Sequence, residues 1–385
     1  MASAIEGVAC AGVLGLAAAM PAPARAADDA PPPITLEYTS DLLSDVSGGT
    51  RRGTGWLGRF DLILDKADGF AGIAGAEAHL DVMLLHGTRF SEDISGDAQV
   101  LSNIEAPRAI RPFEAWLKLP LAANASAKAG YVDLNSEFDV QQVGVPFLNS
   151  SFGIAPDFSQ SGLNGPSIFP VASLGLVLDA GDAEGRAVSF GIFDALPGDP
   201  DHPHAFLPGP PGRDGALLVG EIEQPLSGAA RLRVGGWRYT ARFDRLGGRG
   251  RGRGASGGAY ALIEGRLAGR EDAAALRGWL RAGFASETVN PIGAYLGGGL
   301  AYGDGERLIG LGVAHARLGA PALAAGTGDH RAETAIDLTA KQTLNRFVAV
   351  QPDVQYVIHP SWRSDVRDAL VIGLRLHLTW SPESD

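Results

Sequence analysis

A chain of 385 residues fits two or three ordinary domains or one large β-barrel. Its 45% apolar and 20% charged residues, together with 53 glycines, exclude a disordered chain and a coiled coil. Because 44 acidic residues against 32 basic ones leave a net charge of −12, we also expect no nucleic-acid partner.

The first segment is typical of a secretory signal peptide. Residues 7–20 form an apolar stretch that is too short to cross a bilayer as a helix. The small residues Ala24 and Ala26, which come after it, match the pattern that signal peptidase recognises. We predict a Sec-type signal peptide over residues 1–26, although no basic residue precedes the apolar stretch. The only cysteine, Cys10, would be removed with it, which excludes a disulfide scaffold.

Residues 27–52 are predicted to form a lead-in segment. No later window holds 18 consecutive apolar residues, so no membrane-spanning helix is expected. Instead, apolar and polar residues alternate in short segments, as in strands that are buried on one face. The clearest of these segments are 76–84, 113–119, 333–341, 348–358 and 370–380.

The polar faces of these segments are candidates for the lining of an interior. They consist of Glu77, His79 and Asp81 in the first segment, Glu114, Trp116 and Lys118 in the second, and Gln351, Asp353, Gln355 and Arg375 in the last two. The opposite face of the last segment is apolar throughout and ends at Trp380.

Alternation alone suits both a soluble β-sandwich and a membrane barrel. The signal peptide, the aromatic residues at strand ends and the glycine-rich segments 293–302 and 310–318 favour the barrel, because the glycines have too little bulk to fill a sandwich core. At roughly 43 residues per hairpin, the chain after cleavage holds about 16 strands, the class with an aqueous channel. We predict an all-β fold, a single antiparallel transmembrane β-barrel over residues 53–380 with a C-terminal tail over 381–385.

Four stretches carry a family resemblance. They are Asn103 to Pro107 (NIEAP), Phe147 to Gly153 (FLNSSFG), Gln351 to Pro360 (QPDVQYVIHP) and Asp368 to Leu376 (DALVIGLRL). With them the chain resembles the carbohydrate-selective porin family related to the glucose porin of pseudomonads, from about Gly53 to Trp380. Two features depart from that pattern: five residues follow Trp380, and residues 231–253 are rich in arginine.

The resemblance implies a 16-stranded barrel in the outer membrane of a Gram-negative cell, passive diffusion of monosaccharides and similar small solutes, no cofactor and no enzymatic activity. The implied partners are these solutes, outer-membrane lipid and lipopolysaccharide, and the barrel-assembly machinery. The oligomeric state stays open.

Sugar selectivity suggests particular contacts. A pyranose has apolar C–H faces and a ring of hydroxyls, so an aromatic plate between polar groups suits it. Trp116 between Glu114 and Lys118 offers this combination. A barrel of this size also needs a constriction, and we predict that segment 147–170, with Asp157 and Asn164, folds inward to form it.

Other functions have weaker support. A general or cation-preferring porin is the nearest alternative, because the net charge and the acidic inner face would attract cations. An outer-membrane enzyme or a secreted β-sandwich binding protein is more distant. The G-x-S-x-G match at residues 254–258 lacks the helix that a nucleophile elbow needs, and no metal-ligand cluster appears. The arginine-rich segment is a cationic loop or a lipopolysaccharide contact.

Overall fold

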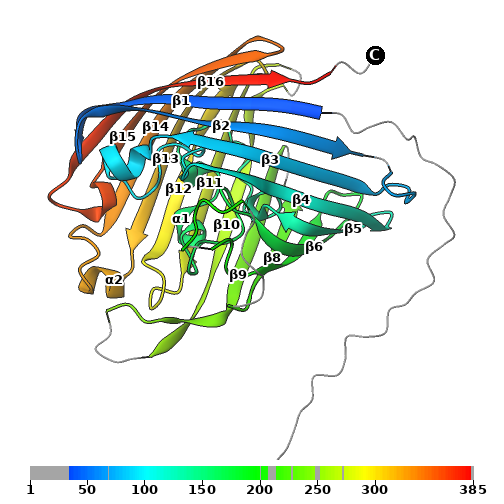
Figure 1. Cartoon of the computed structure of the whole chain (residues 1–385), viewed down its shortest axis with the longest axis horizontal. Helices are drawn as coiled ribbons and strands as arrows, with labels where there is room; N and C mark the ends of the chain where they lie inside the picture. Colours follow the sequence, from blue (N-terminus) through cyan, green and yellow to red (C-terminus); the bar gives the residue numbers. More distant parts are fainter. Residues whose placement is uncertain are drawn as a thin grey trace, which may run out of the picture.

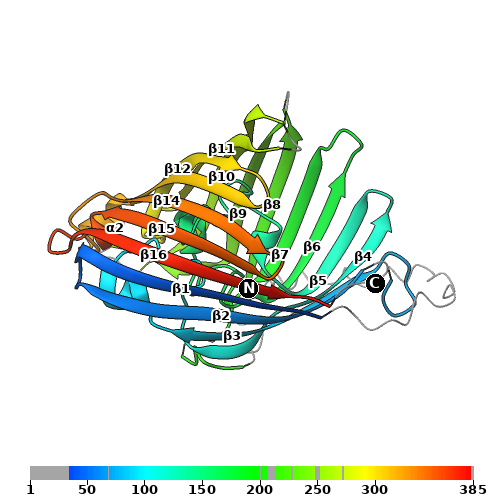
Figure 2. The same cartoon turned by 90° about the horizontal axis from the view of Figure 1, so that it is seen from above.

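The computed structural model describes residues 34–67, 69–199, 201–206, 214–226, 229–247, 252–270 and 273–382. They form a closed barrel of antiparallel strands, β1 to β16, in which each strand pairs with its neighbours in sequence and β1 pairs with β16 (Figures 1 and 2). The predicted all-β fold and the predicted strand number are confirmed.

The strands have the following bounds: β1 Ile34–Gly49, β2 Gly53–Lys66, β3 Glu77–Gly87, β4 Ala109–Ala122, β5 Ala125–Val132, β6 Ser173–Gly181, β7 Ala187–Asp194, β8 Ala216–Pro225, β9 Ala230–Asp244, β10 Arg253–Gly269, β11 Ala275–Ala285, β12 Ile292–Gly303, β13 Arg307–Leu318, β14 Ala332–Asn345, β15 Val348–Ile358 and β16 Arg367–Trp380. Two short helices, α1 (Pro156–Ser159) and α2 (Ala320–Ala324), and single turns at Ser91–Ser95, Leu134–Ser136, Ser150–Phe152 and Pro360–Trp362 lie in the connections. None of the helices in the described ranges is long and apolar enough to cross a membrane.

The alternating segments have the expected orientation. On β16, Ile372 and Leu374 are exposed on the outer face, whereas Val371 and Arg375 are buried on the inner face. On β15, Val354 and Tyr356 are likewise exposed while Gln355 is buried. The apolar face therefore points out of the barrel and the polar face points in.

The predicted start of the barrel is wrong. Residues 34–49, assigned to a lead-in segment, form β1, which is hydrogen-bonded to β2 and to β16 and closes the barrel. A serine pair on the outer face, Ser40 and Ser44, interrupts the apolar alternation and hides this strand in the sequence. The predicted signal peptide lies outside the described residues, and so does the end of the predicted tail.

One predicted strand phase is also wrong. In the predicted segment 113–119, alternation with Glu114, Trp116 and Lys118 places Phe113 on the apolar outer face, but Phe113 is buried inside the barrel. A register shift between Asp81 and Val82, opposite Glu114 and Pro112, changes the alternation at this point. The bulge adds Phe113 as an extra residue in β4, so Phe113 faces the interior instead of the outside.

The two ends of the barrel differ. At one end the connections are short, as at residues 123–124, 304–306 and 346–347; at the other they are long, as at 88–108, 133–172 and 319–331. We call these the short-turn end and the long-loop end. The 88–108 loop and the 133–172 loop fold into the barrel, and α1 of the second loop lies against β11 and β12 (Figure 1).

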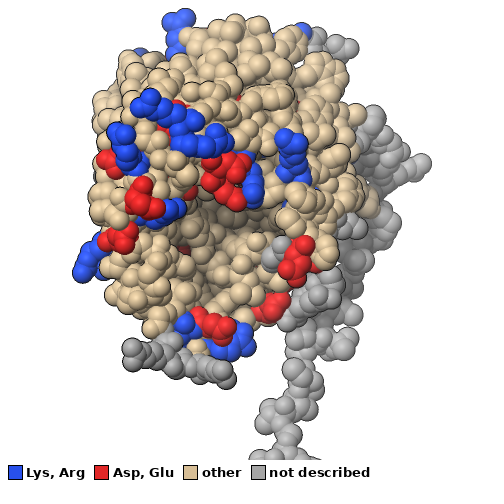
Figure 3. Space-filling model, turned by 60° about the vertical axis from the view of Figure 1, so that its left-hand side comes forward, with Lys and Arg blue, Asp and Glu red and all other residues tan. Residues whose placement is uncertain are grey.

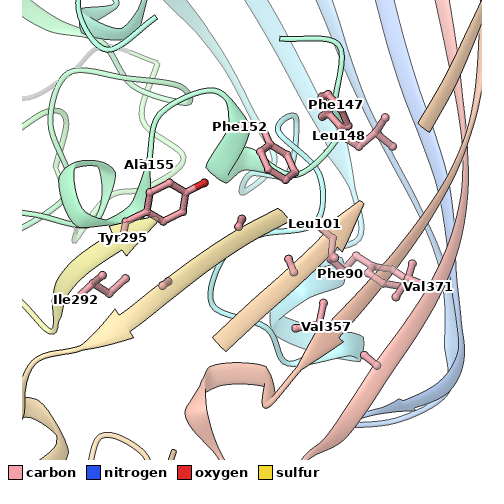
Figure 4. Close-up of a cluster of buried hydrophobic side chains, with 14 of the residues drawn as sticks. Phe90, Leu101, Phe147, Leu148, Phe152, Ala155, Ile292, Tyr295, Val357 and Val371 are labelled. Atoms are coloured by element: carbon pink, nitrogen blue, oxygen red, sulfur yellow. The ribbon is translucent and has the colours of Figure 1, made fainter. Parts of the chain in front are cut away.

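The inward loops pack as a small hydrophobic core. Phe90 and Leu101 of the first loop and Phe147, Leu148 and Phe152 of the second loop lie in one buried cluster with Val357 and Val371 of the wall (Figure 4). The glycine-rich strands make room for them. A Cβ on Gly310 would lie 2.6 Å from the Phe147 ring, and one on Gly312 would lie 2.8 Å from the Phe152 ring. These two glycines therefore receive aromatic side chains of the inward loop.

Candidate functional site

The 133–172 loop is fastened to β11 by a buried ion cluster. The Arg281 guanidinium donates to Asp139 at 2.8 and 3.2 Å and to Asp157, and all three side chains are fully buried. Arg281 also lies 5.2 Å from the Tyr260 ring centre and 5.5 Å from that of Tyr295. Removing one partner of such a cluster strands a buried charge, so the cluster holds the loop firmly in the barrel.

The same loop is bound to the last strands by amides. The Asn149 backbone N–H donates to Asp337 at 3.2 Å, and its side-chain amide donates to Gln355 at 3.1 Å. Gln351 donates to the Pro146 carbonyl at 2.6 Å. The prediction that segment 147–170 folds inward therefore agrees with its contacts.

The 88–108 loop has its own fastening. Glu333 of β14 accepts hydrogen bonds from the backbone N–H groups of Ala98 and Gln99, each at 2.9 Å. Arg375 of β16 donates to Asp41 of β1 at 2.7 and 2.8 Å and to Asn103 of the loop at 2.8 Å. The loop thus covers the wall where the first and last strands meet.

Several predicted site residues lie beneath these loops. Gln351, Gln355 and Arg375 face inward as expected, but they hold loop groups. Asp353 is buried and accepts from Gln355 at 3.0 Å, and Asp157 belongs to the Arg281 cluster. These residues position the loops rather than offering free polar groups to the interior.

The wall formed by β2 to β5 remains more open. Inward side chains there keep part of their surface: 35% for Lys118, 41% for Glu77 and 20% for Arg59. By contrast, the inward residues Glu333, Asp337 and Gln355 of β14 and β15 are fully buried. The free part of the interior therefore runs along β2 to β5.

Trp116 lies on this open wall among polar groups. Its indole N–H donates to Glu114 at 3.1 Å, and the His79 ring stacks on it with ring centres 5.0 Å apart. The Lys128 ammonium lies 4.0 Å from the ring centre and pairs with Glu137. The indole is thus fixed in place by neighbours on β3 and β5, while Lys118 lies 3.8 Å from Glu77.

A second group on this wall was not predicted from the sequence. The Arg59 guanidinium lies 5.1 Å from the ring centres of both Phe113 and Phe169, and it pairs with Asp61 at 2.7 Å and with Asp81 at 3.1 Å. Phe169 comes from the 133–172 loop, so the loop meets the open wall here. Because this contact joins residues from three separate segments, alternation within one strand could not indicate it.

A cavity of about 440 Å³ lies beside this contact, toward the long-loop end. Its lining includes Arg111, Gln160, Asn164 and Phe169. Arg111 is buried, and its Nε has no hydrogen-bond partner among the described residues. Asn164, a predicted site residue, donates to the Pro197 carbonyl at 2.7 Å. The cavity is thus lined by an aromatic ring and amides beside a buried arginine.

The opposite side of the 133–172 loop borders a larger cavity. It has a volume of about 750 Å³ and is lined by Gln142 of the loop and by Glu223, Arg231 and Arg277 of the wall. Arg231 pairs with Glu223 at 3.2 Å. The long-loop end itself is hollowed, with acidic and basic side chains around the hollow (Figure 3). The loop therefore divides the interior into an outer and an inner space.

The 88–108 loop contains a titratable group that should respond to pH. Burial raises the pKa of Glu105 to about 8 from its ordinary value of 4.5, and the charge of the nearby Asp97 adds to the shift. The folded loop therefore favours protonated Glu105, and its stability falls as pH rises from 4.5 toward 8.

We expect larger current fluctuations through the barrel at pH 9 than at pH 6, because ionised Glu105 loosens the loop. The measurement is single-channel recording in a planar bilayer. Glu105→Gln should remove the difference between the two pH values; an equal rise in this variant would assign the effect to another group.

No group of three potential metal ligands occurs in the described part of the chain.

Comparisons with known proteins agree with this architecture. The model of the carbohydrate-selective porin, OprB family, matches residues 64–380. The high-pH structure of Pseudomonas putida OprB superimposes with a TM-score of 0.80 at 17% identity, covering 90% of this chain and 94% of that one. The low-pH structure gives a TM-score of 0.57 at 16% identity, covering 90% and 92%. A triple mutant of the Rh. blastica porin gives 0.52 at 10% identity, covering 90% and 99%. No curated protein matches the chain.

Proposed function

The chain belongs to the carbohydrate-selective porin, OprB family, and from this premise we propose how its channel selects sugars. It is an outer-membrane barrel through which carbohydrates diffuse, and proteins of this family and fold are channels rather than enzymes. We propose monosaccharides and similar small solutes as the transported class, and a Sec-type signal as the export route.

The open wall of β2 to β5 is the observation that most directly supports a path for sugars through the barrel. In barrels of this class the long connections face the cell exterior and the short turns face the periplasm. A solute would enter the 440 Å³ cavity, pass Arg59 and Trp116, and leave through a cavity of about 320 Å³ that Glu77 and Lys118 line at the short-turn end of this wall.

The charges on this wall favour uncharged solutes over cations. Arg59 is paired with Asp61 and Asp81, Lys128 with Glu137, and Lys118 approaches Glu77. Such paired charges offer many donors and acceptors to sugar hydroxyls without a strong net field. The net charge of −12 therefore does not by itself make the channel cation-selective.

The transport test uses liposomes that contain the protein. They should swell faster in a monosaccharide than in a zwitterionic amino acid of similar size, and the sugar should reduce ion current in a concentration-dependent manner. Equal swelling rates without current block, together with a reversal potential that favours cations, would support the general porin instead.

Trp116 is our candidate for the sugar-facing ring. Trp116→Ala should leave the barrel assembled and weaken sugar block about ten-fold, which corresponds to ~1.4 kcal/mol, because it removes the ring and releases His79 and Lys128. The control is Leu117→Ala, since Leu117 is exposed on the outer face of the same strand. If sugar blocks the ion current of both variants as strongly as that of the parent, Trp116 lies away from the sugar path.

Among the remaining predicted residues, we propose that Glu77, His79, Asp81, Glu114 and Asn164 line the path. Lipopolysaccharide, other outer-membrane lipids and the barrel-assembly machinery are the further partners that we propose.

A further inference from the structure

Three arginines gather on the outer face of β9 and β10. Arg238 and Arg242 of β9 are exposed, and Arg253 begins β10 beside them. Trp237 and Tyr239, on either side of Arg238, are buried inside the barrel. Because side chains alternate along a strand, Arg238 points outward, as does Val234, which is 48% exposed.

Two of these arginines have no partner among the residues that the structure describes. Neither Arg238 nor Arg242 has a hydrogen bond or ion pair within the described parts of the chain, whereas Arg253 lies 3.9 Å from Asp244. Their cross-strand neighbours on β10 are small: Gly257 faces Arg238, and Ala255 faces Arg242. The surface beside the two guanidinium groups is therefore flat and open.

The depth of Arg238 can be estimated from the strand. Eight residues separate it from Ala230, the first residue of β9, which gives about 26 Å along the strand and about 20 Å along the membrane normal at a typical tilt. The apolar band of such barrels is about 25 Å tall. Arg238 thus lies about 5 Å inside the long-loop edge of the band, where its long side chain can reach the interface, and Arg242 lies beyond the edge.

Three other cationic side chains on the described outer face lie near the ends of their strands. Lys66 and Arg307 lie at strand ends on the short-turn side, and Arg317 near the end of β13 is 4.0 Å from Glu287. An arginine on the outer face costs most at the membrane centre and little at the interface. Unpartnered arginines at this depth would meet anionic groups of lipid.

We propose that Arg238 and Arg242, with Arg253, bind the phosphate groups of a lipid A type glycolipid in the outer leaflet. A guanidinium can form two parallel hydrogen bonds to one phosphate. The glycolipid would lie over Gly257 and Ala255. This inference rests on the proposed membrane orientation and lipid partner, and it adds the binding residues.

The test measures the binding of diphosphoryl lipid A to the full-length protein in detergent micelles. The double variant Arg238→Gln with Arg242→Gln should bind about ten-fold more weakly than the parent. Arg307→Gln, at the other end of the outer face, should bind like the parent. Monophosphoryl lipid A should bind the parent more weakly and respond less to the double variant.

Equal affinity of the parent and the double variant would overturn the proposal, and so would an equal loss in Arg307→Gln. Gel mobility without heating reports whether the barrel is folded. If the double variant does not fold, the single variants replace it, and each should bind lipid A about three-fold more weakly than the parent.

Sugar block is measured in parallel. Normal block without the arginine dependence would refute the lipid site alone, and normal lipid binding without sugar block would refute the transport proposal alone.

Discussion

Replacing Arg281 with methionine should release the 133–172 loop and change a selective channel into a wider one. The change leaves Asp139 and Asp157 buried without their cation, and losing one partner of a buried ion pair costs about 3–5 kcal/mol. The barrel hydrogen bonds are untouched, so the loop should move before the wall opens. We expect a several-fold rise in single-channel conductance and loss of sugar block.

The control for this prediction removes the carboxylates as well. A triple variant with Arg281→Met, Asp139→Asn and Asp157→Asn has no buried charge at this site, and it should recover part of the sugar block. Leu280→Ala, on the outer face of the same strand, should leave conductance unchanged. Normal conductance and normal block in Arg281→Met would show that the ion cluster does not hold the constriction.

Replacing Gly312 with valine should displace the same loop from another side. The new Cβ would lie 2.8 Å from the Phe152 ring, and the two further methyl groups would occupy the space that the ring now fills. Valine is a good strand residue, so the wall should still form. Phe152 and the turn around it should shift toward the open wall.

We therefore expect lower conductance and slower swelling in sugar for Gly312→Val, opposite in sign to Arg281→Met. Leu311→Val is the matched control, since Leu311 is the exposed neighbour on the outer face. The Phe152→Ala change in the Gly312→Val background should restore conductance because it removes the clashing ring. A Gly312→Val channel with parental conductance would show that the loop accommodates the new side chain.

The wall of the barrel was largely predictable from the sequence, and the exceptions have physical reasons. Segments 76–84, 348–358 and 370–380 alternate regularly because one face meets lipid and the other meets polar groups. β1 was missed since Ser40 and Ser44 replace apolar residues on its outer face; Trp56 covers Ser40 there, donating to its hydroxyl at 2.7 Å. Phe113 was misplaced because a bulge leaves no mark in the apolar pattern.

The filling of the barrel was much less predictable. Arg281 and Asp139 are 142 residues apart in the chain, and neither belongs to a motif. The glycines of β13 were noticed, but their role depends on which ring lies against each one, and only the folded loop determines this. Some inward polar residues of the wall bind the loops and others stay accessible to the interior. Strand alternation could not distinguish the two kinds. Arg59 and Phe169 were missed for the same reason.

The pairing of β1 with β16 also bears on how the chain folds. Every other strand pair joins neighbours in sequence, so those hairpins can form locally and quickly. The last pair must bring Leu36 to Trp380, the most distant contact in the barrel, and it places Arg375 directly opposite Asp41. Until then both edge strands expose unpaired backbone groups and could pair with another molecule. The Asp41 to Arg375 ion pair therefore links the two strands whose pairing we expect to form last. The longer β1 and β16 stay unpaired, the more this protein should aggregate during assembly.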